Sequence, residues 1–268
     1  MVFNPFGEGL AVLWDLIATF ISLISVFLLV QINARIQKSG KVSTIVTRKL
    51  VHIFAGPIYI ITWLLFTGNV FSHYFAVIVP TLFIIQFISI GTGKMKNESF
   101  VASMSRTGDP RELLKGTLYY AIIMAIITLV WFYVPLGDVH NLNPTSLVVI
   151  GCLSGGDGLA DIVGRKFGGV RKFGIKGSEK TLVGSLAMFL GSFLVSLILV
   201  LIFSLAATNL YIIKLILPII IISLVATIVE ALSPKGIDNW TIFIAVIIMI
   251  AIFSFFLPQI WPYQFFSF

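Results

Sequence analysis

The sequence predicts an all-α protein, a polytopic bundle of about seven or eight transmembrane helices. Hydrophobic residues make up 58% of the 268 residues and charged residues only 11%, whereas a soluble domain carries about 25% charged residues. The apolar residues gather in runs of about 20, the length that crosses a bilayer as a helix. We expect one integral-membrane domain over residues 1–268, because no polar stretch is long enough to separate two.

Eight segments are apolar enough to be candidate spans. They are residues 10–32, 52–65, 71–90, 116–136, 145–159, 182–205, 211–232 and 237–257. The second and the fifth are short or polar at one end, so the count is seven or eight. Pro57, Pro80 and Pro218 fall inside spans, where proline can bend a membrane helix without abolishing it.

The basic residues indicate the orientation in the membrane. Every Lys and Arg except Lys214 lies in residues 35–49, 94–115 or 165–180, or at Lys235. With eight spans, these segments share one face. The positive-inside rule makes that face cytoplasmic and places both termini on the other side. This topology, with attraction to membrane lipid headgroups, accounts for the net charge of +7, and no nucleic-acid partner is expected.

One polar cluster interrupts the apolar chain, GGDGLADIVGRKFGGVRK at residues 155–172. Asp157 and Asp161 are four residues apart and therefore share one face of a helix. Carboxylates at the edge of a span are costly unless they are paired or functional. Two such carboxylates suit a Mg²⁺ ion that keeps some of its waters and bridges to phosphate oxygens.

Glycines and bases that could hold a polyanion follow these carboxylates. The candidates for nucleotide binding are Gly164, Arg165, Gly168, Lys172, Lys176, Lys180, Thr181 and Gly184. The glycines offer backbone N–H groups, and a new helix begins near Thr181, with an N-terminus that favours anions. The cluster indicates a Mg²⁺–nucleotide site, although many cytoplasmic loops are also rich in glycine and basic residues. No GxxxxGK[ST] sequence is present, which excludes a P-loop.

Three further segments place polar side chains on the same face. The candidates are Arg48, Lys49 and His52 at span two, Arg111 and Glu112 before span four, and Glu230, Asp238 and Asn239 between spans seven and eight. Helix capping or headgroup anchoring explains each segment taken alone. Four charged segments on one face of a small bundle indicate a site.

These segments resemble, in order and spacing, the polyprenol kinase family, which includes phytol, farnesol and geranylgeraniol kinases and, more distantly, dolichol kinase. The matching stretches are RKLVH, RELLKGTLYY, GDGLADIVGRKFG, KGSEKTLVGSLAMF and EALSPKGIDN, within about residues 48–240. The dolichol kinase pattern for CTP fits at Asp157, Ala160, Gly164 and Gly168, and again at Lys180, Thr181 and Gly184. Val183 stands where that pattern has Glu, which favours a shorter isoprenoid than dolichol.

The resemblance implies a kinase that phosphorylates the terminal hydroxyl of an isoprenoid alcohol of the geranylgeraniol, phytol or farnesol class, typically with CTP. Asp157 and Asp161 would hold Mg²⁺ on the β- and γ-phosphates, and the bases from Arg165 to Lys180 would stabilise the transferring phosphoryl group. His52, Glu230 or a metal-binding Asp would accept the hydroxyl proton. Nothing in the sequence distinguishes CTP from ATP or UTP.

Two other functions are compatible with parts of the pattern. A cytidylyltransferase that makes a CDP-lipid would use the same Mg²⁺–CTP site but would release pyrophosphate instead of CDP. A transporter or lipid-binding protein with a fifth helix broken around GGDG would show internal pseudo-symmetry, of which the sequence gives no sign.

Overall fold

The computed structural model describes residues 4–105, 107–134, 143–206 and 210–266, and these residues contain helices and no β-strand. The all-α prediction is confirmed. The helices are α1 (Ala11–Lys38), α2 (Thr44–Ile61), α3 (Ser72–Ala76), α4 (Ile78–Gly91), α5 (Glu98–Met104), α6 (Gly116–Val130), α7 (Thr145–Ile150), α8 (Asp157–Phe167), α9 (Leu182–Ser204), α10 (Ile212–Ala231) and α11 (Asp238–Phe256). Short helical turns join them: η1 (Glu8–Leu10), η2 (Thr62–Leu65), η3 (Pro110–Leu114) and the π-helical turn η4 (Gly151–Gly156).

Eight helical stretches of the described chain are long and apolar enough to cross a membrane, which confirms the larger predicted count. The second and fifth spans are longer than the hydrophobic pattern predicts, Thr44–Leu65 and Thr145–Phe167. Both helices continue into charged residues that the pattern assigned to loops, such as Lys49 and Arg165. The fourth runs over Pro110–Val130 and ends before the predicted residue 136.

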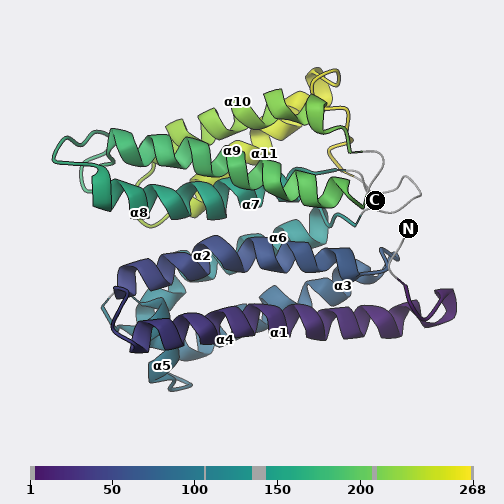
Figure 1. Ribbon diagram of the computed structural model, residues 1–268, viewed down its shortest axis with the longest axis horizontal. Coiled ribbons are helices and arrows are strands. Elements are labelled where there is room, and N and C mark those ends of the chain that lie inside the picture. Colours follow the sequence, from purple (N-terminus) through teal and green to yellow (C-terminus); the bar gives the residue numbers. More distant parts are fainter. Residues whose placement is uncertain (1–3, 106, 135–142, 207–209, 267–268) are drawn as a thin grey trace.

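The helices form two halves that lie side by side, with α1–α5 in one and α7–α11 in the other (Figure 1). The turn between α1 and α2, helix α5 and the loop between α8 and α9 all lie at one end of the bundle. We call this the basic end, because it carries the basic segments of the sequence. The start of α1 and the segment after α11 lie at the opposite end. Arg106, which also belongs to the predicted basic segments, lies outside the described residues.

One buried carboxylate serves the fold at the end opposite to the basic end. Asp15 of α1 accepts hydrogen bonds from the Thr67 backbone N–H at 2.8 Å and from the Ser72 hydroxyl at 2.6 Å. These contacts tie α1 to the segment after η2 and to the start of α3. Because a carboxylate inside a span needs partners and Asp15 finds them within the chain, we assign it a structural role.

Small residues bring η4 and α8 into close contact with α9. An added Cβ at Gly155 would lie 2.6 Å from the Gly191 carbonyl oxygen, and one at Gly191 would lie 2.3 Å from the Gly155 oxygen. A Cβ at Gly151 would meet the Ser196 hydroxyl at 1.9 Å. Close approach of this kind is typical of helix contacts in membranes, where small residues let backbones meet. The contact fixes the start of α8, where Asp157 lies.

We expect Gly191→Ala to destabilise the bundle, because its methyl group collides with backbone that cannot rotate away. Overpacking of this kind costs about 1–3 kcal/mol, so the melting temperature of the purified protein in detergent should fall by several degrees. Leu190→Ala is the matched control, since Leu190 is next in the chain and exposed on the surface of α9. Equal melting temperatures for Gly191→Ala and the wild type would contradict the proposed packing role.

Candidate active site at the basic end

Asp157 is the first residue of α8 and lies buried between the two halves of the bundle. The wide turn η4 precedes it, and π-helical turns are frequent at functional sites. Its Oδ2 atom is 2.8 Å from the Lys49 Nζ and 3.2 Å from the His52 Nε2. Lys49 is itself 7% exposed. Two of the predicted candidates on α2, Lys49 and His52, thus meet Asp157 directly, although Lys49 is 108 residues away in the sequence.

Asp161 lies one turn farther along α8 and is more exposed to solvent than Asp157. The Arg165 Nε donates to its Oδ1 at 2.5 Å. Lys49 Nζ and Arg48 Nη2 each lie 3.8 Å from its Oδ2. Lys49 therefore stands between the two predicted metal-binding carboxylates and offsets their mutual repulsion.

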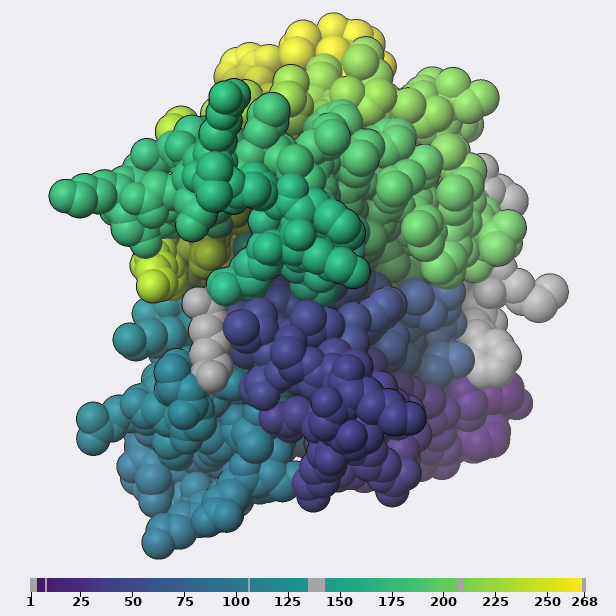
Figure 2. All heavy atoms as spheres, turned by 60° about the vertical axis from the view of Figure 1, so that its left-hand side comes forward, coloured from purple at the N-terminus to yellow at the C-terminus, as the bar shows by residue number. Residues whose placement is uncertain are grey.

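A polar cavity of about 660 Å³ opens beside these two carboxylates. Eleven predicted site residues line it: Lys49, Asp157, Asp161, Gly164, Arg165, Lys172, Lys180, Thr181, Gly184, Glu230 and Asp238. They come from α2, α8, the loop between α8 and α9, α9, α10 and α11. In Figure 2, which turns the basic end toward the viewer, the green segment around α8 and α9 lies above the blue segment that contains the start of α2.

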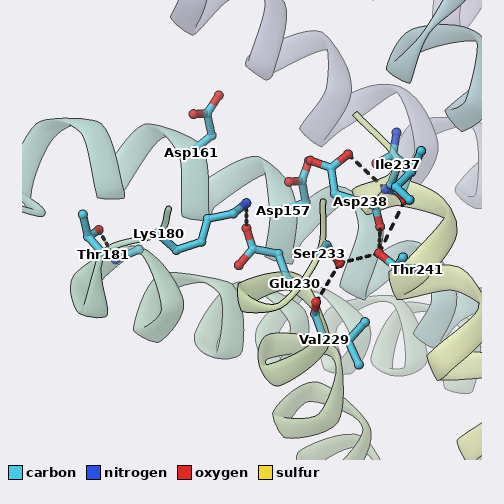
Figure 3. Close-up of polar contacts among 12 residues, drawn as sticks. Asp157, Asp161, Lys180, Thr181, Val229, Glu230, Ser233, Ile237, Asp238 and Thr241 are labelled. Carbon is cyan, nitrogen blue, oxygen red and sulfur yellow. Dashed lines mark hydrogen bonds and ion pairs between the residues drawn. The ribbon is translucent and has the colours of Figure 1, made fainter. Parts of the chain in front are cut away.

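Lys180 and Glu230 form an ion pair inside the polar cavity (Figure 3). Glu230, near the end of α10, is almost completely buried. Burial alone lowers the pKa of the Lys180 ammonium, but the charge and the hydrogen bond of Glu230 outweigh burial and raise this pKa above its usual value. Lys180 therefore stays cationic at neutral pH and presents a positive charge to the cavity.

Thr181 and the glycines shape the α8–α9 connection. Thr181 caps α9, because its hydroxyl accepts a hydrogen bond from the Gly184 N–H at 3.1 Å. A Cβ at Gly164 would lie 3.2 Å from the Gly184 Cα, and one at Gly168 would lie 2.4 Å from the Thr181 hydroxyl. The Gly168 N–H donates to the Gly164 carbonyl oxygen at 3.0 Å. These residues position the loop by close packing.

A second cavity, which we call the apolar groove, has a volume of about 610 Å³. Its mouth at the basic end is polar and contains His52, Glu112 and Asn239. Its inner wall consists of apolar side chains from α1, α2, α4 and α6, among them Val30 and Phe83. The groove is therefore suited to an amphiphile whose polar group stays at the basic end.

The polar cavity and the apolar groove share part of their walls. Lys49, Asp157, Lys235 and Asp238 line both. We call these four residues the shared rim. Figure 3 shows Asp157 and Asp238 next to each other and Lys180 paired with Glu230. Lys180 and Glu230 line the polar cavity but not the groove. A group bound in one cavity can thus meet a group bound in the other at this rim.

Two hydrogen-bonded contacts hold the mouth of the groove in place. Glu112 accepts from the hydroxyls of Ser105 at 2.8 Å and Thr107 at 3.1 Å, which ties these two residues to η3. The Asn239 amide donates to the Gly116 carbonyl oxygen at 2.9 Å and joins the starts of α11 and α6. Both residues therefore position the mouth as well as line it.

The carboxylate oxygens around the polar cavity fit a magnesium ion that keeps some of its water ligands. Asp161 Oδ2 and Glu230 Oε2 are buried and accept no hydrogen bond from the described residues. Within the described chain, no three His, Cys, Asp or Glu side chains lie close enough to enclose a metal by themselves. Mg²⁺ usually takes only one or two carboxylates and fills its other positions with waters and substrate phosphates, so Asp157 and Asp161 remain suitable ligands.

Not every predicted site residue reaches a cavity. Arg111, Gly168 and Lys176 line neither the polar cavity nor the apolar groove, and the Arg111 and Lys176 side chains are exposed. Conversely, Lys235 of the shared rim was not among the predicted residues. Its place in the short loop that ends at Asp238, the first residue of α11, was the available signal, because residues close together in a tight loop share one location.

Comparison with known proteins relates the chain to isoprenoid-alcohol kinases. It is 39% identical over 160 residues to "Probable phytol kinase 2, chloroplastic" of Oryza sativa subsp. japonica, covering 60% of this chain and 49% of that protein. It is 38% identical over 197 residues to "Probable phytol kinase 3, chloroplastic" of Glycine max, covering 73% of this chain and 59% of that protein. It is 37% identical over 186 residues to "Farnesol kinase, chloroplastic" of Arabidopsis thaliana, and the match covers 69% of this chain and 57% of that protein.

The chain spans 49–59% of the length of these three curated relatives. No protein-family model and no solved structure matches it. The similarity to several phytol kinases and to a farnesol kinase nevertheless agrees with the motifs at α2, α8 and the α10–α11 loop. The chain is therefore similar to phytol and farnesol kinases, the proteins whose family its motifs resemble.

Proposed function

We propose that this protein transfers the γ-phosphoryl group of a nucleoside triphosphate, CTP in the first place, to the terminal hydroxyl of a membrane isoprenoid alcohol. The observation that carries the proposal is the shared rim, where a polar cavity and an apolar groove meet. The alcohol is held in the bilayer by its tail, since each buried methylene contributes about 0.8 kcal/mol, whereas the nucleotide is held in water. A kinase for this pair needs two such compartments in contact.

The charges of the polar cavity suit a metal-bound triphosphate. Lys49, Arg165, Lys172, Lys180 and Lys235 supply positive charge. Asp157 and Asp161 would hold Mg²⁺, which when bound neutralises the β- and γ-phosphate oxygens. Because phosphoryl transfer depends mainly on positioning and electrostatic stabilisation, these bases would then stabilise the charge on the transferring group.

The apolar groove would bind the isoprenoid tail with the hydroxyl at its mouth. The hydroxyl oxygen forms a bond to the γ-phosphorus, the bond from this phosphorus to the bridging oxygen breaks, and the nucleoside diphosphate leaves. We assign the role of general base to Asp238, which would accept the hydroxyl proton. Asp238 lies on the shared rim at the start of α11. Glu230 lines the polar cavity alone and is paired with Lys180, and His52 lines the groove alone and contacts Asp157.

The site would face the cytoplasm. The basic end carries both cavities and the basic segments, and the positive-inside rule assigns such an end to the cytoplasmic side. Nucleotides are available on that side. A protease-protection experiment on the loop between α8 and α9 in oriented vesicles tests this assignment, and cleavage only from the luminal or external side would contradict it.

We expect Asp157→Asn to abolish most of the activity. Loss of this charge removes a metal ligand and the nearer of the two carboxylates that pair with Lys49. Transfer from [γ-³²P]CTP to geranylgeraniol, phytol or farnesol should therefore fall by about 100-fold or more. Glu98→Gln, an exposed acidic residue on α5 outside both cavities, should keep wild-type activity.

The same assay with CTP, ATP and UTP identifies the donor and distinguishes the reaction type. A kinase releases CDP, whereas a cytidylyltransferase releases pyrophosphate. If the purified wild type releases pyrophosphate, or phosphorylates no isoprenoid alcohol with any of the three donors, the proposed function is wrong.

We expect Asp238→Asn to lower kcat by about 10²–10⁴-fold, the range for loss of a general base, with little change in the KM for the nucleotide. The amide keeps the size of the carboxylate but cannot accept the hydroxyl proton. His52→Gln is the comparison variant. A large loss in His52→Gln together with near-normal kcat in Asp238→Asn would assign the proton to His52 instead.

A further inference from the structure

The lining of the apolar groove stops before the far end of each of the four spans that form its inner wall. We measure depth along each helix, starting from the basic end. The deepest lining residues are Val26 on α1, Tyr59 on α2, Val79 on α4 and Met124 on α6. Beyond them, the buried Trp63, Phe66 and Ile127 fill the interior. The groove therefore has a floor, and the Tyr59 ring is its largest member.

Tyr59 is fixed in place by two hydrogen bonds in an otherwise apolar region. Its hydroxyl donates to the Ala76 carbonyl oxygen at 2.9 Å and contacts the Thr128 hydroxyl at 3.0 Å. Its ring lies edge-on to Trp63, with ring centroids 5.7 Å apart. Tyr59 is 2% exposed. The ring thus bridges α2, α3 and α6 and cannot move aside without breaking buried hydrogen bonds.

Pro80 explains why an acceptor is available for Tyr59. In a regular helix the Ala76 carbonyl would accept from the N–H of residue 80, but proline has no N–H. The helix is interrupted at this point, with α3 ending at Ala76 and α4 beginning at Ile78. A buried carbonyl without a donor is unfavourable in an apolar interior, and Tyr59 satisfies it. Pro80 also lines the groove, so the floor and its support form one unit.

The depth of the groove can be compared with the length of an isoprenoid tail. Lys49 at the rim and Tyr59 at the floor are ten residues apart on α2, which corresponds to about 15 Å at 1.5 Å per residue. An extended chain advances about 3.5 Å for every three bonds, so one isoprene unit of four bonds spans about 5 Å. The groove then accommodates about three isoprene units in extended form.

We propose that Tyr59 is a specificity-determining residue that limits the tail to about three isoprene units. This inference rests on the proposed function, because it assumes that an isoprenoid alcohol places its hydroxyl at the shared rim. An alcohol with three units, such as farnesol, fills the groove. A fourth unit, as in geranylgeraniol, meets the Tyr59 ring and has to bend back or leave the groove sideways.

The test compares geraniol, farnesol and geranylgeraniol as substrates of the purified protein in nanodiscs. We expect the wild type to have its highest kcat/KM with farnesol. Tyr59→Ala should raise the ratio of kcat/KM for geranylgeraniol to that for farnesol by at least about tenfold, since even one methylene changes discrimination by 10-fold or more. Tyr59→Phe keeps the ring and should leave this ratio within about twofold of wild type.

Ala121→Leu tests the inference in the opposite direction and does not depend on the folding of Tyr59→Ala. Ala121 lines the groove on α6 one turn closer to the mouth than Met124, so a larger side chain there should shorten the groove and favour geraniol over farnesol. An unchanged length profile in both Tyr59→Ala and Ala121→Leu would overturn the inference, because the tail would then leave the groove before the floor.

A second measurement separates this inference from the proposed function. The shift in melting temperature that each alcohol causes, recorded without nucleotide, reports tail binding alone. If the shifts follow the predicted length preferences while no alcohol is phosphorylated, the floor is supported and the proposed function is wrong. If phosphorylation occurs but neither the shifts nor kcat/KM depend on residue 59 or 121, the floor is wrong and the proposed function stands.

Discussion

The buried contact between Asp157 and Lys49 is the interaction on which the arrangement at the basic end depends. Asp157 belongs to α8 in one half of the bundle and Lys49 to α2 in the other, and their charged atoms are 2.8 Å apart. A buried charge that loses its partner is strongly destabilising, by about 3–5 kcal/mol. The pair therefore holds the two halves in register at the point where the polar cavity and the apolar groove meet.

This fixed arrangement of the two halves places a cavity that is open to water next to a groove in apolar surroundings. The polar cavity is lined by loops and helix ends, where water and counter-ions are available. The apolar groove runs between α1, α2, α4 and α6, where the surroundings are apolar. Because the shared rim is built from α2, α8, α11 and the loop before α11, a change in the packing of any of these helices alters both cavities together. The close glycine contacts between α8 and α9 limit such changes.

The bundle also contains buried polar groups with a purely structural task, and their partners distinguish them from the site. Asp15 accepts hydrogen bonds from backbone and hydroxyl donors of the same chain. In contrast, Asp161 and Glu230 each keep one buried oxygen that accepts no hydrogen bond from the described residues. Carboxylate oxygens that accept no hydrogen bond and lie beside a cavity are available to a ligand.

The sequence by itself determined that the chain has seven or eight apolar spans, and it determined the basic segments and the motif residues, because hydrophobicity and charge are local properties of the chain. It also indicated that Asp157, Lys180 and Glu230 belong to one site, through motifs that are recognisable without a structure. Only the tertiary structure decided that Lys49 and His52 contact Asp157, that Lys235 reaches the rim while Lys176 does not, and that Tyr59 closes the groove. These outcomes depend on how each helix is rotated and how closely it packs, which is set by contacts between residues far apart in sequence.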